Sequence, residues 1–152
     1  MPTSTRFVVS LHTLAMIARN AGEPTSSESI AADVGTNPAV IRALLSRLAS
    51  AGLTTSQRGN GGGALLARPV SEITLLDAYL AVEEREIFTF HSSAADDRHS
   101  VSHYIFDSVA TPLKHAREAM ERALAVISLR DIVDDIQRRY ETSVTNDDRV
   151  QS

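Results

Sequence analysis

Apolar side chains recur along the first fifty residues at the three- to four-residue spacing of helices. Phe7, Leu11, Leu14 and Ala18 share one face of a first predicted helix, which ends near residues 20–22. A short helix is predicted over residues 29–34, and a third helix follows it and ends at residues 51–52. The third helix directs its apolar side chains inward, and these are Val40, Ile41, Leu44, Leu45 and Leu48.

The turn between the second and third helices has a specific chemistry. Gly35 supplies the backbone angles of a tight turn, Asn37 suits the N-cap of the next helix, and Pro38 suits its first turn. Two helices joined by a three-residue turn that contains glycine form a helix-turn-helix.

Two short extended stretches follow, over residues 53–57 and 64–67. The segment between them, residues 58–63, reads Arg-Gly-Asn-Gly-Gly-Gly and contains four glycines in six residues. This pattern predicts a two-stranded hairpin with a tip that carries few side chains. A hairpin directly after a helix-turn-helix predicts a winged helix.

A fourth helix is predicted to run to Val82, with Thr74 or Ser71 as its cap. Residues 83–86, with three glutamates and one arginine, are interpreted as a solvated helix end. His12 is interpreted as a packing residue of the first helix. Residues 84–103 have mixed polarity, which predicts a loop or linker.

A long helix is predicted near the end of the chain. From Tyr104 to Ile127 it would span about 36 Å, and Pro112 would either begin it or kink it. Ser128 is expected to cap a last short helix that ends at Tyr140. A heptad-like stripe suited to packing along a partner helix contains Phe106, Val109, Leu113, Ala116, Met120, Ala123 and Ile127.

The predicted fold is therefore mainly α: a winged helix-turn-helix domain with a small two-stranded β wing, plus a long C-terminal dimerisation helix. The expected divisions are a DNA-binding domain over 1–83, a linker or candidate sensor loop over 84–103, dimerisation helices over 104–141, and a flexible tail over 142–152.

Charge is distributed unevenly, although the formal net charge is −4. Residues 1–70 hold six arginines and three acidic residues, a balance of +3. The remaining residues hold nine basic and sixteen acidic side chains, a balance of −7. A basic first half favours a polyanionic partner, so this distribution supports a DNA-binding module.

The chain contains no cysteine, which excludes disulfides, thiolate-bound clusters and a cysteine nucleophile. Its 43% hydrophobic and 22% charged residues are ordinary for a globular protein. No apolar run reaches the roughly 18 residues that span a bilayer, and no signal pattern is present. We therefore expect a cytoplasmic protein with no membrane partner.

The predicted winged helix has the chemistry to bind DNA. Thr36, Asn37, Arg42 and Ser46, together with small alanines, can face a major groove from the third helix. The glycine-rich wing can approach the backbone closely, while Arg58 reaches a minor groove. A phosphate-binding loop is disfavoured because this loop lacks the Gly-Lys-Ser/Thr ending.

Several motifs, taken in order, resemble the Rrf-two (BadM-type) family of bacterial winged-helix regulators, which are usually repressors. They lie at residues 30–53, at the wing Ser-Gln-Arg-Gly-Asn-Gly-Gly-Gly over 56–63, and at Leu-Ala-Arg-Pro over 66–69. Further matches are Ile-Thr-Leu-Leu-Asp over 73–77 and Ser-Leu-Arg-Asp-Ile-Val over 128–133.

The resemblance implies a homodimer that presents two winged helices to an inverted-repeat operator of double-stranded DNA. By position it implies DNA contacts at Arg6, Glu28, Thr36, Asn37, Pro38, Val40, Arg42, Arg58, Asn60 and Gly61. Many members hold an iron–sulfur cluster through three cysteines before the dimerisation helix. This chain has none there, so we expect no cluster and no thiol switch.

The same stretch carries His91, His99 and His103 beside Asp96 and Asp97. These residues could bind a divalent metal or haem, but a solvated loop is the favoured interpretation because the spacing matches no established site. The sequence leaves open whether a small-molecule or protein effector binds. The favoured function is a DNA-binding repressor, and the alternative is a winged-helix interaction module or corepressor component without its own ligand sensor. No nucleophile–base pair or metal signature supports an enzyme.

Overall fold

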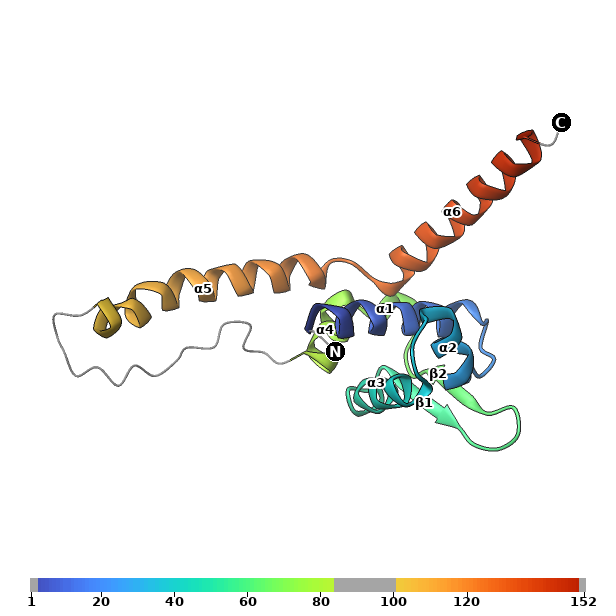
Figure 1. Cartoon of the computed structure of the whole chain (residues 1–152), viewed down its shortest axis with the longest axis horizontal. Helices are drawn as coiled ribbons and strands as arrows, with labels where there is room; N and C mark the ends of the chain where they lie inside the picture. The colour runs from blue at the N-terminus through green and yellow to red at the C-terminus, as the bar shows by residue number, and fades with distance from the viewer. Residues whose placement is uncertain (1–2, 84–100, 151–152) are drawn as a thin grey trace.

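A computed structural model describes residues 3–83 and 101–150, with side chains described for 5–83, 101 and 104–144. The first part holds four α-helices, a two-stranded hairpin and a 3-10 turn, and we call it the reading head (Figure 1). Its elements are α1 (Thr3–Arg19), α2 (Ser27–Val34), α3 (Pro38–Ser50), β1 (Thr54–Gln57), β2 (Gly63–Leu66), η1 (Val70–Glu72) and α4 (Leu75–Val82). Two C-terminal helices follow: α5 (Val101–Ala125) and α6 (Leu129–Val150).

The hydrophobic core lies among the helices of the reading head. Helices α1, α2 and α3 meet through apolar side chains with the predicted helical spacing, and α4 closes the cluster. Burying apolar area in this way is the main stabilising contribution to a domain of this size. The fully buried side chains at its centre include Leu14, Ile30, Ile41, Leu48, Leu53, Ile73 and Val82.

The hairpin pairs β1 and β2 in antiparallel register, from Thr54 opposite Leu66 to Gln57 opposite Gly63. A further bridge joins Ala64 to Thr25, just before α2, through N···O distances of 2.8 and 3.0 Å. The hydroxyl of Thr54 in β1 also donates to the carbonyl of Leu45 in α3 at 3.5 Å. The base of the wing therefore contacts both α3 and the segment that leads into α2.

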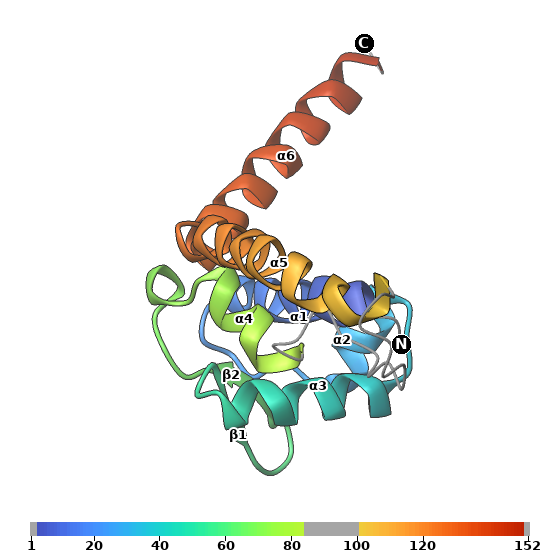
Figure 2. The same ribbon diagram turned by 90° about the vertical axis from the view of Figure 1, so that its left-hand side faces the viewer.

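The junction between α5 and α6 is tied to the start of α4. Leu129 is almost fully buried, and its N–H donates to the carbonyl of Ile73 at 2.7 Å. The N–H of Leu75 donates in return to the carbonyl of Ile127 at 2.9 Å. Figures 1 and 2 show that α5 and α6 both extend from this junction beyond the reading head.

The caps that the sequence suggested set the helix starts. Thr74, one of the two predicted caps, forms a capping box with Asp77 at the start of α4. Ser128 accepts from the N–H of Asp131 at 3.2 Å, and the Asp131 carboxylate accepts from the N–H of Ser128 at 2.8 Å. Hydrogen bonds from Ser128 lower the pKa of Asp131 below its ordinary value.

Pro112 lies inside α5, as one of the two predicted alternatives places it, and the alternative in which it begins the helix was wrong. The helix begins at Val101, three residues before the predicted start at Tyr104. Helix α6 continues to Val150, so the predicted end at Tyr140 was wrong. The predicted flexible tail over 142–152 was also wrong, because residues 142–150 are helical. No glycine or proline interrupts residues 129–150, and ion pairs one turn apart, such as Arg139–Asp135 at 2.6 Å, support the helix.

The predicted fold class is confirmed: a mainly helical winged helix-turn-helix with a two-stranded wing and a long helix after it. No helix in the described ranges is long and apolar enough to cross a membrane.

Candidate nucleic-acid interface

The turn between α2 and α3 is built as its sequence suggests. Gly35 adopts a left-handed conformation with φ of 75°, and Thr36 donates its N–H to the carbonyl of Ala31 at 2.9 Å. Asn37 caps α3 by accepting from the N–H of Ala39 at 2.8 Å. Pro38 occupies the first turn without the loss of a hydrogen bond, because the first N–H groups of a helix have no partner within it.

Helix α3 has one buried face and one exposed face. Ile41, Leu44 and Leu48 are buried in the core, whereas Arg42 and Ser46 are exposed. Val40 packs partly against the core, so its side chain is less available than the sequence suggested. Beside Arg42 and Ser46, the exposed face carries the small side chains of Ala39 and Ala43.

Arg42 is held by α2. Its guanidinium donates to Glu28 Oε1 at 2.9 Å and to Ser27 Oγ at 3.3 Å. Both partners of the ion pair are well exposed, at 59% for Arg42 and 66% for Glu28. Hydrogen bonds from its own backbone and from Ser27, with the nearby Arg42 charge, lower the pKa of Glu28, so its carboxylate is ionised near neutrality. The pair fixes Arg42 against α2 on the exposed side of the molecule.

The wing tip is formed by residues 58–62. Gly59 and Gly61 have φ values of 102° and 76°, which L side chains rarely adopt. A side chain at Gly63 would collide with the carbonyl oxygen of Thr25, 2.5 Å from the Cβ position. Glycine is therefore required here by the backbone path and by the close approach of the Thr25 segment.

Arg58 begins this tip and is exposed. Within the part of the chain that the structure describes, no hydrogen bond or ion pair engages its guanidinium. Asn60 and Gly61 are also exposed, at the turn of the loop. Arg42 and Arg58 thus differ, since the first is held by a carboxylate and the second is open to a ligand.

A groove of about 320 Å³ separates α3 from the wing. It is lined by Arg42 and Ser46 from one side and by β1 and Gly63 from the other. Figures 1 and 2 place α3 and the wing on the side of the reading head away from α5 and α6. The structure thus brings Glu28, Arg42, Ser46 and the wing to one surface, which we call the reading surface.

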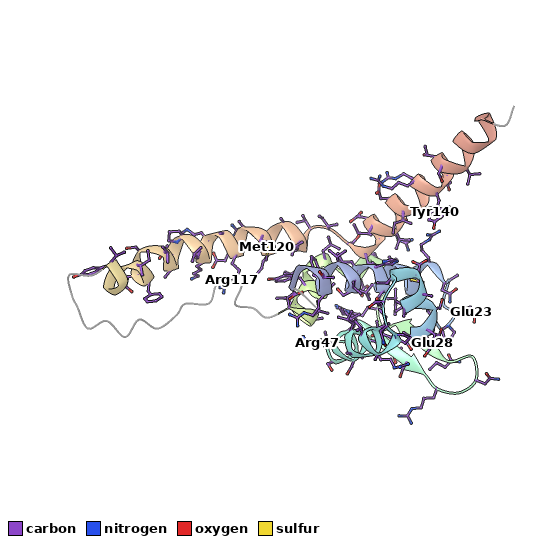
Figure 3. All side chains as sticks on the ribbon, viewed as in Figure 1. Glu23, Glu28, Arg47, Arg117, Met120 and Tyr140 are labelled. Atoms are coloured by element: carbon purple, nitrogen blue, oxygen red, sulfur yellow. The ribbon has the colours of Figure 1, made fainter. Side chains whose placement is uncertain are left out.

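Arg6 has a partner inside the fold. It pairs with Glu83 Oε2 at 3.1 Å, and the Glu83 side chain is only 1% exposed. Nearby, Arg47 donates to the carbonyl of Val82 at 3.0 Å and so joins the end of α3 to the end of α4 (Figure 3). Glu83 is therefore not a solvated helix end as interpreted, because Arg6 provides a counter-charge that permits its burial. A DNA contact by Arg6 stays a prediction.

The predicted dimer stripe is divided between two environments in a single chain. Ala116 and Ala123 are exposed, whereas Phe106, Val109, Leu113, Met120 and Ile127 are half-buried. Sequence reasoning missed two exposed apolar residues at the start of α5, Val101 at 78% and Ile105 at 42%. Val101 escaped notice because residue 101 was assigned to the linker, and Ile105 because it lies beside the predicted stripe and is not one of its members.

His91 and His99 lie outside the described residues, as does the side chain of His103. Among the side chains that are described, no three histidine, aspartate or glutamate residues are grouped to hold a metal. His12 is half-exposed and pairs with Asp33 at 2.6 Å, which corrects its interpretation as a packing residue.

Comparison with known proteins matches residues 3–135 to the Rrf2 family, described as "Iron-dependent Transcriptional regulator". The chain belongs to the Rrf2 family. It is a transcriptional regulator with a DNA-binding fold, in a family of regulators rather than enzymes.

Relatives of this Rrf2 protein include "Putative HTH-type transcriptional regulator YwnA" of Bacillus subtilis, which is 35% identical over 131 residues. That alignment covers 86% of this chain and 96% of the relative. Among solved structures, IscR of T. potens is similar with a TM-score of 0.62 and 26% identity, over 90% of this chain and 86% of that one. The global cysteine regulator CymR of B. subtilis shares the fold, with a TM-score of 0.64, 24% identity, and coverage of 88% and 97%.

Proposed function

We propose that this Rrf2 protein is a homodimeric repressor that reads an inverted-repeat operator with α3 and the wing of each subunit. The reading surface is the observation that carries the proposal. A capped helix with an exposed polar face lies beside a glycine-tipped hairpin, and both lie away from the C-terminal helices (Figure 2). A helix of this kind fits a major groove, and a slim hairpin can follow the backbone into the adjacent minor groove.

The arginines of the reading surface have different roles in this proposal. Arg58 is exposed and unengaged, so it is available for the electronegative minor groove. Arg42 is oriented by Glu28 and contacts base edges or phosphates from α3. Asn37 Oδ1 is committed to capping, which leaves its amide N–H₂ group to donate.

A second copy of the chain is proposed to pack along α5. This helix extends beyond the reading head with Val101 and Ile105 exposed at its far end. Helices with exposed apolar faces of this length are normally covered in solution. A second α5 related by two-fold symmetry would cover both copies at once and would place two reading surfaces on one face of a duplex.

Iron dependence is not carried over from the family description. The chain has no cysteine, and no group of three potential ligands is found among its described side chains. The donor set of a thiolate-bound cluster is therefore lacking, and we propose that regulation uses a different signal.

Selection of bound duplexes from a random DNA pool at near-physiological salt tests the proposed function. We expect recovery of an inverted repeat whose half-sites are about one helical turn, 10–10.5 base pairs, or a multiple of it apart. Recovery of no enriched sequence would contradict operator reading and would favour the interaction-module alternative. DNA affinity should also fall steeply with added salt, since arginine–phosphate contacts release counterions, whereas a protein interface is less sensitive.

A further inference from the structure

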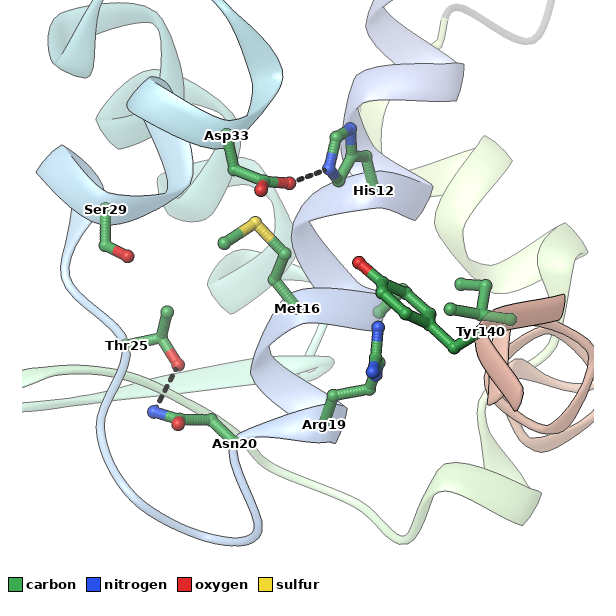
Figure 4. A pocket seen from close by; sticks show the side chains of 10 residues that line it. His12, Met16, Arg19, Asn20, Thr25, Ser29, Asp33 and Tyr140 are labelled. Carbon is green, nitrogen blue, oxygen red and sulfur yellow. Dashed lines mark hydrogen bonds and ion pairs between the residues drawn. The ribbon is translucent and has the colours of Figure 1, made fainter. Parts of the chain in front are cut away.

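A solvent-open pocket of about 390 Å³ lies between α1, α2 and α6 (Figure 4), and it shares no lining residue with the groove beside the wing. Its volume falls within the range of about 300–1,000 Å³ that is usual for small-molecule sites. The side chains that carry its chemistry are His12, Met16, Arg19, Ser29, Asp33 and Tyr140.

Arg19 provides a cation that is oriented by stacking. Its guanidinium carbon lies 4.5 Å from the ring centroid of Tyr140, so α6 holds the end of α1 by a cation–π contact. Among the described residues, no carboxylate or carbonyl accepts from Arg19. Stacking on a ring uses the face of a guanidinium and leaves its N–H edge for an acceptor, and a carboxylate fits that edge in bidentate geometry.

Asp33 provides the opposite charge across the pocket (Figure 4). One carboxylate oxygen, Oδ2, lies 2.6 Å from His12 Nε2, and the Asp33 side chain is 58% exposed. The second oxygen can therefore accept from a bound group. The Ser29 side chain lines the same wall, from the preceding turn of α2.

Met16 lies between these two ends, and Ala15 and Ile136 also line the pocket. The pocket thus combines a cation, an anion and an apolar wall, each from a different part of the surface. A simple anion such as phosphate would be attracted by Arg19 and repelled by Asp33. A simple amine would be attracted by Asp33 and repelled by Arg19.

We infer that this pocket binds a small dipolar carboxylate of the size and charge of an α-amino acid. The carboxylate accepts from the N–H edge of Arg19, the ammonium group donates to Asp33, and the apolar part lies against Met16. Three elements contribute to the site, so an occupied pocket holds α2 to α1 and to α6.

The regulatory consequence rests on the proposed function as a DNA-binding repressor. Ser29 directly follows Glu28, which holds Arg42 of α3 at 2.9 Å. A ligand that fixes α2 therefore fixes the support of the recognition helix and its orientation to α6. If the ligand changes operator affinity by some factor, the operator changes ligand affinity by the same factor.

Binding is tested on the full chain without DNA, by titration calorimetry and by the melting temperature. The probes are the twenty L-amino acids singly, with propionate, propylamine and inorganic phosphate as probes that lack one of the two charges. We expect at least one amino acid to bind and to raise the melting temperature, with about tenfold weaker binding of the probes that carry a single charge. Binding of no amino acid, or equally tight binding of propionate or phosphate, would overturn the assignment.

Variants place the site. Arg19→Gln and Asp33→Asn should each weaken binding of that amino acid about tenfold or more, and Arg19→Lys should recover part of the loss. Arg130→Gln, which removes an exposed arginine of α6 outside the pocket, should leave binding unchanged. An unaltered circular-dichroism spectrum and melting temperature without ligand check that each variant is folded. Unchanged amino acid binding by folded Arg19→Gln would contradict the site.

Because the titrations contain no DNA, failure of this inference is distinguishable from failure of the proposed function. If the chain selects an inverted repeat but binds no amino acid, the repressor proposal stands and the assignment of this pocket is wrong. If the chain binds an amino acid through Arg19 but selects no DNA sequence, the assignment of the pocket stands and the repressor proposal is wrong.

Discussion

The reading head and the C-terminal helices differ in how far their apolar side chains are buried. In the head, seven large side chains from four helices and the segments between them are almost fully buried within one chain. Among the described residues of α5 and α6, only Leu129 is buried, and it belongs to the core of the head. The head thus completes its core within one chain, with Leu129 of α6 as a member, whereas a long helix with half-covered apolar residues requires another surface.

The largest expected effect concerns the core of the head. Leu14 on α1 is fully buried, and Leu14→Ala should lower the free energy of unfolding by about 2–5 kcal/mol, because it removes packed atoms and leaves a cavity. Val8→Ala on the same helix, where the side chain is 62% exposed, should change it by less than about 0.5 kcal/mol. Chemical denaturation measures both, and equal losses would contradict a core centred on Leu14.

Ile105→Glu tests the other side of the comparison. Ile105 is 42% exposed in the single chain, so the substitution should leave the head folded but place a charge in the α5 interface. We expect monomers by analytical ultracentrifugation and operator binding weaker by about 10²-fold or more, because the gain from two linked half-sites is lost.

Ala110→Glu is the matched control, since Ala110 is exposed and lies on a different face of α5. It should keep the dimer and its affinity. Loss of the dimer in both variants, or in neither, would contradict the assigned face of α5.

Arg58→Ala removes the unengaged arginine of the wing. Operator binding should weaken by about 1–3 kcal/mol. The slope of log affinity against log salt concentration should decrease by about one, the value for one lost phosphate contact. Arg130→Ala, on α6, should alter neither. Fluorescence anisotropy with labelled operator at several salt concentrations is the measurement. Unchanged affinity for Arg58→Ala would argue against the wing as a DNA contact.

Glu28→Gln should have the smallest effect. It frees Arg42 and removes a carboxylate from a surface that faces phosphates, so DNA binding should tighten by about fivefold or less. The lowered pKa of Glu28 keeps its carboxylate charged from about pH 6 to pH 8, so the difference from the unaltered protein should be constant there. A difference that disappears toward pH 6 would show that Glu28 titrates in this range.

The head could be predicted from the sequence because its structure follows from local chemistry. Gly35, Asn37 and Pro38 specify the turn and the start of α3, and the glycines of residues 59–63 specify the wing. These residues act on their immediate backbone neighbours, so their consequences are visible in a short stretch of sequence.

Features that join distant segments could not be predicted in this way. The Arg6–Glu83 pair joins residues 77 positions apart, and the pocket beside Arg19 exists only because Tyr140 on α6 reaches α1. The end of α6 was missed for another reason, since polar residues without a breaker are compatible with both a tail and a helix. The proposed dimer belongs to the same class, because half of its contacts would come from another chain.

The mass of the protein–operator complex tests the central claim most directly. Native mass spectrometry of the 16.4 kDa chain with a duplex that carries both half-sites should show two chains per duplex, and Ile105→Glu should greatly reduce that species. One chain per duplex, bound as tightly as in the unaltered complex, would contradict the account in which two reading heads share α5.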